Sequence, residues 1–164
     1  MQMDFLLVLF VCVAAVTDIS SRRIPNALVA SGLAAAIMMH SFLPSGDGLG
    51  TALLGALTGF ALFLPMYLLK GMAAGDVKLM AAVGAFAGPP MTFKIALATF
   101  VVGGVMAIAM VAWKGKLGMA VVNALALVRP HLFVPAGPSV GGMPYGVAIA
   151  VASVIMTLSR HGLL

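Results

Sequence analysis

The sequence predicts an all-α polytopic membrane protein, and three observations lead to this fold class. Hydrophobic residues make up 63% of the 164 residues, charged residues make up only 8%, and the mean hydropathy is +1.18. Soluble globular domains carry about 25% charged residues, so the composition excludes an ordinary soluble core. The apolar residues also fall into runs that approach the roughly 20 residues a helix needs to cross a bilayer. We therefore expect residues 1–164 to form a single transmembrane domain in a lipid bilayer.

Six apolar runs give six candidate spans in one bundle. They cover residues 1–17, 27–43, 49–69, 75–89, 93–113 and 142–158. The first lacks the basic segment that opens a cleavable signal peptide, so we interpret it as a retained span. A turn-forming sequence, Leu43-Pro44-Ser45-Gly46-Asp47-Gly48, separates the second and third, and Gly88-Pro89-Pro90 ends the fourth. The first and fourth are short, which predicts a thinned or water-penetrated bilayer at one end of each.

A longer segment, residues 114–141, separates the fifth and sixth spans. It contains an apolar run from Leu117 to Val128, flanked by Lys114, Lys116 and Arg129. These twelve residues are too few to cross a bilayer, so we expect an interfacial helix or a re-entrant segment.

The positive charges indicate the orientation of the spans, because Lys and Arg are retained on the cytoplasmic side in short loops. With six spans, Lys94 and Arg160 fall on one side and the other seven cations on the opposite side. These seven are Arg22, Arg23, Lys70, Lys78, Lys114, Lys116 and Arg129. We therefore expect both termini to face away from the cytoplasm. The cations are scattered between apolar runs rather than massed in a stripe, so nucleic acid is not an expected partner.

Asp18 and Asp76 are two of only four carboxylate side chains, and both border apolar runs. A carboxylate at membrane depth is costly and therefore calls for an explanation. The predicted topology brings both to the inner membrane surface. Simpler alternatives remain open: Asp18 is a boundary residue paired with Arg22 or Arg23, and Asp76 only caps a helix.

The residues around the two aspartates also shape this end of the bundle. After Asp18 the chain breaks at Ile24-Pro25-Asn26, because proline lacks a backbone donor and disfavours helical geometry in its predecessor. Lys78, just after Asp76, is a charge partner for either aspartate or reaches the interface on its own. Small residues before Asp76 allow another backbone to approach closely, which a plain cap does not require. These small residues are Gly71, Ala73, Ala74 and Gly75.

Two carboxyls within a few ångströms of each other cannot both ionise easily, so they share a proton. In peptide hydrolysis the ionised member draws a proton from water while the protonated member hydrogen-bonds the scissile carbonyl. A coupled pair titrates as a unit, so the role of each aspartate stays open. The three histidines share no ligand-like spacing with the acids, and Cys12 is the only cysteine, so we expect no metal and no cofactor.

Three motifs follow one another along the chain. They are Asp18 with Arg22-Arg23-Ile24-Pro25-Asn26, then Gly75-Asp76-Val77-Lys78-Leu79, then Met143-Pro144-Tyr145-Gly146-Val147-Ala148-Ile149-Ala150. In this order the motifs resemble the signatures of the type IV prepilin peptidases, intramembrane aspartic proteases of the Gly-x-Gly-Asp class. The resemblance implies that Asp18 and Asp76 are catalytic. Candidate substrate-binding or site-shaping residues are Ala73, Gly75, Lys78, Pro25, Asn26 and Tyr145, although Tyr145 is equally well interpreted as an interfacial anchor.

Two departures from the family pattern refine this interpretation. Ala73 stands where the family has the first glycine of Gly-x-Gly-Asp, and the chain lacks the cysteine-paired cytoplasmic methyltransferase region of longer members. It therefore resembles the short, peptidase-only form found with tight-adherence (Flp-type) pilus systems. The resemblance implies a membrane-embedded prepilin substrate with a short leader, cut at the cytoplasmic face of the bacterial inner membrane, and pilus-assembly machinery as a further partner.

Other classes of protein stay open as alternatives. A small proton- or cation-coupled transporter also carries intramembrane carboxylates, although these typically lie near the bilayer midplane rather than at span ends. A non-catalytic pilus-assembly scaffold with the same fold is a further alternative. Gly55-x-x-x-Gly59 and Gly84-x-x-x-Gly88 have the small-residue spacing of close helix contacts, and we expect these contacts within the bundle rather than in a dimer.

Overall fold

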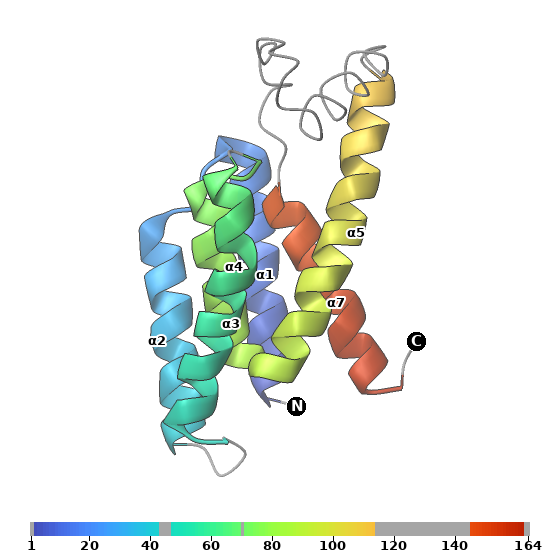
Figure 1. The fold of residues 1–164 in the computed structure, drawn as a ribbon. Helices are drawn as coiled ribbons and strands as arrows, with labels where there is room; N and C mark the ends of the chain where they lie inside the picture. The colour runs from blue at the N-terminus through green and yellow to red at the C-terminus, as the bar shows by residue number, and fades with distance from the viewer. Residues whose placement is uncertain (1, 43–46, 70, 114–144, 163–164) are drawn as a thin grey trace. The chain divides into compact units, whose positions relative to one another are not determined.

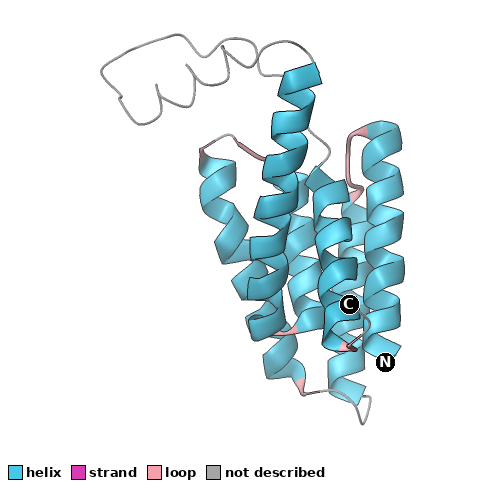
Figure 2. Ribbon diagram, turned by 90° about the vertical axis from the view of Figure 1, so that its right-hand side faces the viewer, coloured by secondary structure: helices cyan, strands magenta, loops and turns pink. Residues whose placement is uncertain are grey.

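The computed structural model describes residues 2–42, 47–69, 71–113 and 145–162, and the regular elements in these ranges are all helices (Figures 1 and 2). They are α1 (Gln2–Ser21), α2 (Asn26–Phe42), α3 (Leu49–Leu68), α4 (Ala74–Ala87), α5 (Pro89–Trp113) and α7 (Tyr145–Arg160). The prediction of an all-α membrane bundle is confirmed. Each of the six expected spans corresponds to one of these helices.

The helices differ in their ability to cross a membrane. By length and composition, α1, α3 and α5 are long and apolar enough to do so, and α2 and α7 are shorter apolar helices. The shortest is α4, with 14 residues, nine of which are buried. It contacts α1, α2, α3 and α7, so its surroundings are mostly protein rather than lipid. Helix α4 is therefore the central element of the fold.

The chain divides into two compact units. The first contains Met1–Val102 and Pro144–Leu164, and the second contains Gly103–Met143. Of the second unit the structure describes Gly103–Trp113, a continuous piece of α5. The interfacial or re-entrant segment expected in residues 114–141 lies outside the described residues. The site described below lies wholly in the first unit.

Helix α1 continues to Ser21, beyond residue 17 where the first expected span ends, so Asp18 lies in the last turn of the helix. The Ser20 hydroxyl donates to the Val16 carbonyl at 2.8 Å, and the Ser21 hydroxyl donates to the Thr17 carbonyl at 2.7 Å. These bonds satisfy both hydroxyl groups within the helix itself. Arg22, with φ 51°, then closes the helix through its N–H to the Asp18 carbonyl at 2.9 Å.

Helices α3 and α4 approach each other through glycine. A Cβ atom at Gly55 would overlap the carbonyl oxygen of Gly84, and one at Gly84 would overlap that of Gly55. One turn along α3, a Cβ at Gly59 would overlap the Met80 carbonyl oxygen. The expectation that these small-residue motifs pack within the bundle is confirmed. This contact fixes the position of α4, the helix that carries Asp76.

Candidate active site

Asp18 and Asp76, the carboxyl pair, lie at one end of the first unit. The C-terminal end of α1 meets the N-terminal ends of α4 and α7 there (Figure 1). Both residues are buried, with exposed fractions of 6% for Asp18 and 5% for Asp76. The two carboxyls are close enough to interact electrostatically. Residues that are far apart in the sequence thus form one acidic site at the ends of three helices.

Asp18 is held by the last helix of the chain. The backbone N–H of Gly146, the second residue of α7, donates to Asp18 Oδ2 at 2.8 Å. Arg22 also interacts electrostatically with Asp18. This agrees with the simpler alternative in which Asp18 is paired with Arg22 or Arg23. Both the α7 N-terminus and the guanidinium favour a negative charge at this position.

Gly146 is the site residue that the sequence analysis missed. It stood in the third motif, but only its neighbour Tyr145 was selected there. Gly146 lies in the first turn of α7, where the cost of glycine in a helix interior does not apply, so its signal in the sequence was only its place in the third motif beside Tyr145.

Asp76 occupies the third position of α4 and caps that helix. Its Oδ2 accepts a hydrogen bond from the Ala73 N–H at 3.2 Å. Asp76 is therefore a helix cap, as the simpler alternative states, and it also lies close enough to Asp18 to interact with it. Ala73 contributes through its backbone, so its methyl group in place of the family's glycine does not alter this bond.

Lys78 bonds to a neutral partner rather than to an aspartate. Its Nζ donates to Asn26 Oδ1 at 3.1 Å, which joins α4 to the first residue of α2. Pro25, just before that helix, accepts the Val29 N–H at 3.3 Å through its carbonyl. The Pro25–Asn26 turn and Lys78 therefore tie α2 to α4 beside the carboxyl pair.

Loss of the Lys78–Asn26 hydrogen bond should have only a small effect on activity. Lys78→Met and Asn26→Ala each remove the bond, whose net contribution is about 0.5 kcal/mol because both residues are exposed. For the peptidase activity that the family resemblance implies, we expect kcat/KM to fall about two- to threefold in each variant. The double variant should be no worse than either single one. A loss of several orders of magnitude in Lys78→Met would instead place the ammonium in the chemistry.

The close backbone approach expected at the small residues before Asp76 is not seen at Gly75. A Cβ there would lie 3.6 Å from the Ile24 side chain, an ordinary contact, because the turn before Pro25 directs Ile24 over this position. The nearest atoms to a Cβ at Gly71 belong to Met66, at 3.4 Å. The backbone contacts that require glycine lie further along α4, at Gly84.

Tyr145, the first residue of α7, interacts electrostatically with Asp76 and is partly buried. Of the two interpretations left open for it, a position near the site agrees with this interaction. The site therefore combines two carboxyls, a phenol and the N–H of the following glycine.

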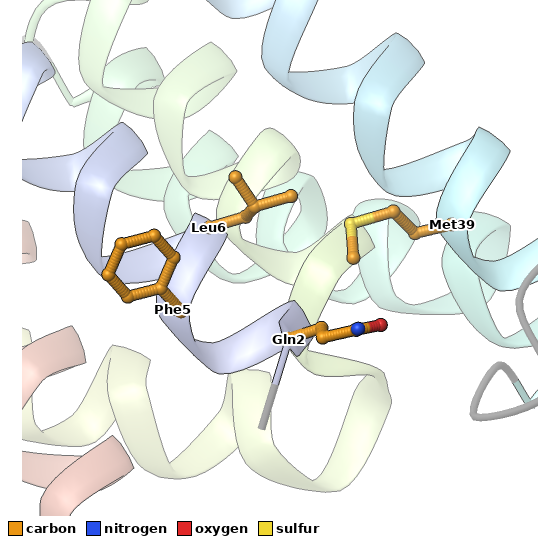
Figure 3. Close-up of a pocket in the computed structure, with 4 residues that line it drawn as sticks. All are labelled: Gln2, Phe5, Leu6 and Met39. Carbon is orange, nitrogen blue, oxygen red and sulfur yellow. The ribbon is translucent and has the colours of Figure 1, made fainter.

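Two cavities in the described residues lie away from the carboxyl pair. One, of about 440 Å³, is lined by Gln2, Phe5, Leu6 and Met39 near the start of α1 and the end of α2 (Figure 3). The other, of about 400 Å³, includes Lys94 and Arg160 in its lining. Neither includes Asp18, Asp76 or Gly146. The chemistry of the site therefore depends on the carboxyl pair and not on these hollows.

The carboxyl pair has the parts needed for acid–base hydrolysis. One oxygen of each carboxyl is fixed by a backbone N–H, and burial together with mutual repulsion favours one shared proton. Such a pair can take a proton from water and give another to a carbonyl oxygen in the same step. The geometry alone does not name the substrate.

Comparison with known proteins identifies the family of the chain. The sequence pattern of the type IV leader peptidase family matches residues 5–108, a range that contains both Asp18 and Asp76. No curated protein and no solved structure matches the chain. The family match covers more than half of the 164 residues. The chain therefore belongs to the type IV leader peptidase family, a class of membrane hydrolases.

Proposed function

We propose that the protein is an intramembrane aspartic endopeptidase that removes the leader peptide of type IV prepilins, with Asp18 and Asp76 as its catalytic residues. The observation that carries the proposal is the buried carboxyl pair within the segment matched by the family. The ionised member takes a proton from water as the water oxygen attacks the scissile carbonyl carbon. The protonated member gives its proton to the carbonyl oxygen. When the tetrahedral species collapses, the first member passes the proton that it took from water to the amine nitrogen, the second member takes a proton back from a hydroxyl of that species, and the C–N bond breaks to release the amine and the carboxylic acid.

The location of the site supports cleavage at the cytoplasmic face of the bacterial inner membrane. Arg22, Arg23 and Lys78 lie at the same end of the first unit as the carboxyl pair. Lys94, in the second turn of α5, and Arg160, the last residue of α7, lie at the opposite end. Cations concentrate on the cytoplasmic side, so this distribution favours a site that faces the cytoplasm. Carboxyls at helix ends also fit peptide hydrolysis at the membrane surface better than ion transfer through the midplane.

The proposed substrate is a prepilin of the Flp type, a membrane-embedded helix with a short leader, which pilus-assembly machinery then uses. The ends of three helices meet at the carboxyl pair, and this supports a site beside the membrane surface, where a leader would emerge. A helical substrate must unwind there to expose its peptide bond, because a helix shields its backbone.

Co-expression tests this proposal directly. The chain is expressed with Flp-type prepilins and with a type IV prepilin of long leader, and processing is followed as a mobility shift on gels. We expect the short-leader prepilins to be shortened by the length of the leader, and zinc chelators to leave the purified reaction unchanged. An unprocessed prepilin beside a well-expressed, inserted chain would reject the proposed function and favour a scaffold. Proton-dependent flux in vesicles without proteolysis would favour a transporter.

A further inference from the structure

Gly146 is placed to act on the chemistry through Asp18. Its N–H donates to Asp18 Oδ2 at 2.8 Å in a buried contact between α7 and α1. This is a bond from the first turn of a 16-residue helix, where unpaired N–H groups and the helix dipole favour an anion. The acceptor is a buried side chain whose exposed fraction is 6%.

The absence of a side chain at Gly146 has a specific cause. A Cβ there would lie 2.7 Å from Asp18 Oδ2 and 3.0 Å from Asp18 Cβ, closer than side chains normally approach. The backbone of Gly146 is not among those with positive φ in the described residues, so its conformation does not require glycine. Glycine is needed here because the carboxylate occupies the space that a side chain would fill.

The two carboxyls have unequal surroundings. Asp18 accepts a 2.8 Å bond from a different helix and also interacts with the positive charge of Arg22. Asp76 accepts a 3.2 Å bond from Ala73, the residue just before its own helix, and the charge acting on it is that of Asp18. Donors and cations favour the ionised form of a carboxyl, and a neighbouring anion favours the neutral form.

We propose that Gly146 is a positioning residue that holds Asp18 in its ionised form, so that Asp18 activates the water and Asp76 supplies the proton. This inference rests on the proposed function. It assigns to the two carboxyls the roles that the sequence left open. It also explains why the third motif, which contains Gly146, must contact the first motif, which contains Asp18.

Enzyme kinetics provide the first test, with Gly146→Ala against Gly50→Ala. Gly50 is a matched control because it is also the second residue of a helix, and a Cβ there meets no atom of the described ranges within 4 Å. Gly146→Ala should lower kcat/KM for prepilin about 10²-fold, the effect of moving a catalytic group by about 1 Å, and Gly50→Ala should not.

The acidic limb of the rate–pH profile should also move to higher pH in Gly146→Ala. A carboxylate that loses a donor is protonated more easily, so the ionised base disappears earlier as the pH falls.

Thermal unfolding of the purified full-length chain provides the second test and requires no activity. Gly146→Ala should lower the unfolding midpoint when Asp18 is present and should have a clearly smaller effect in an Asp18→Ala background, because the carboxyl group is then gone and only the Cβ at position 18 remains close. Equal shifts in both backgrounds, or an unchanged rate and pH profile in Gly146→Ala, would overturn the inference. The two proposals can also fail separately. If the shift caused by Gly146→Ala depends on Asp18 but the wild-type chain cleaves no prepilin, the proposed function is rejected while the Asp18–Gly146 contact stands.

Discussion

Asp18→Asn and Asp76→Asn should each lower the rate of prepilin cleavage by about 10³-fold or more, since an amide can neither take the proton from water nor give one to the carbonyl oxygen. Asparagine is nearly the same size as aspartate. Its side-chain oxygen can still accept the N–H of Gly146 at position 18 or that of Ala73 at position 76, so both variants should fold. The measurement is single-turnover cleavage of purified prepilin by purified enzyme in detergent or liposomes.

Three controls make this result specific to the chemistry. Membrane insertion and the thermal unfolding midpoint of both variants should stay close to those of the wild type. The double variant should be no slower than the worse single variant, because residues that act as a unit are not additive. Asp47→Asn is the matched control, since this exposed aspartate lies near the start of α3 at the opposite end of the fold. Either active-site variant retaining wild-type turnover would exclude an aspartate pair.

The carboxyl pair was predictable from the sequence for a simple physical reason. Carboxylates are so costly in apolar surroundings that two of them at the borders of apolar runs stand out in a chain that has only four. The order of the spans also predicts that Asp18 and Asp76 share a side, and the structure places them at one end of the first unit. The helices were predictable because apolar runs of nearly membrane-spanning length specify them directly.

The finer features of the site depend on contacts that sequence patterns do not encode. The last turn of α1 contains Ser20 and Ser21, residues that favour helix ends and turns, yet here their hydroxyls bond to carbonyls of the helix itself. The partner of Lys78 depends on where α2 begins, and the structure selects Asn26 over either aspartate. The role of Gly146 depends on a contact with Asp18 across the whole length of the chain.

Gly84→Ala should destabilise the fold and lower activity together, because one methyl group must separate α3 from α4. A Cβ at Gly84 meets the carbonyl oxygen of Gly55, and backbone cannot move aside as a flexible side chain does. Overpacking of this kind costs about 1–3 kcal/mol. Helix α4 carries Asp76 in its first turn, so a displaced α4 also changes the distance between the two carboxyls. We expect a lower unfolding midpoint and a reduced kcat/KM in the same variant.

The comparison with Gly104→Ala separates close packing from the general effect of replacing glycine in a helix. Within the residues that the structure describes, a Cβ at Gly104 meets nothing within 4 Å, and alanine there should be neutral or slightly stabilising because it favours the helix. Gly55→Ala should resemble Gly84→Ala, because the two glycines face each other. The double variant should cost less than the sum of the two single costs, since the first separation of the helices already makes room for the second methyl group. An unfolding midpoint of Gly84→Ala at or above that of the wild type would show that α3 and α4 do not meet through these glycines, and the position of Asp76 would then need another support.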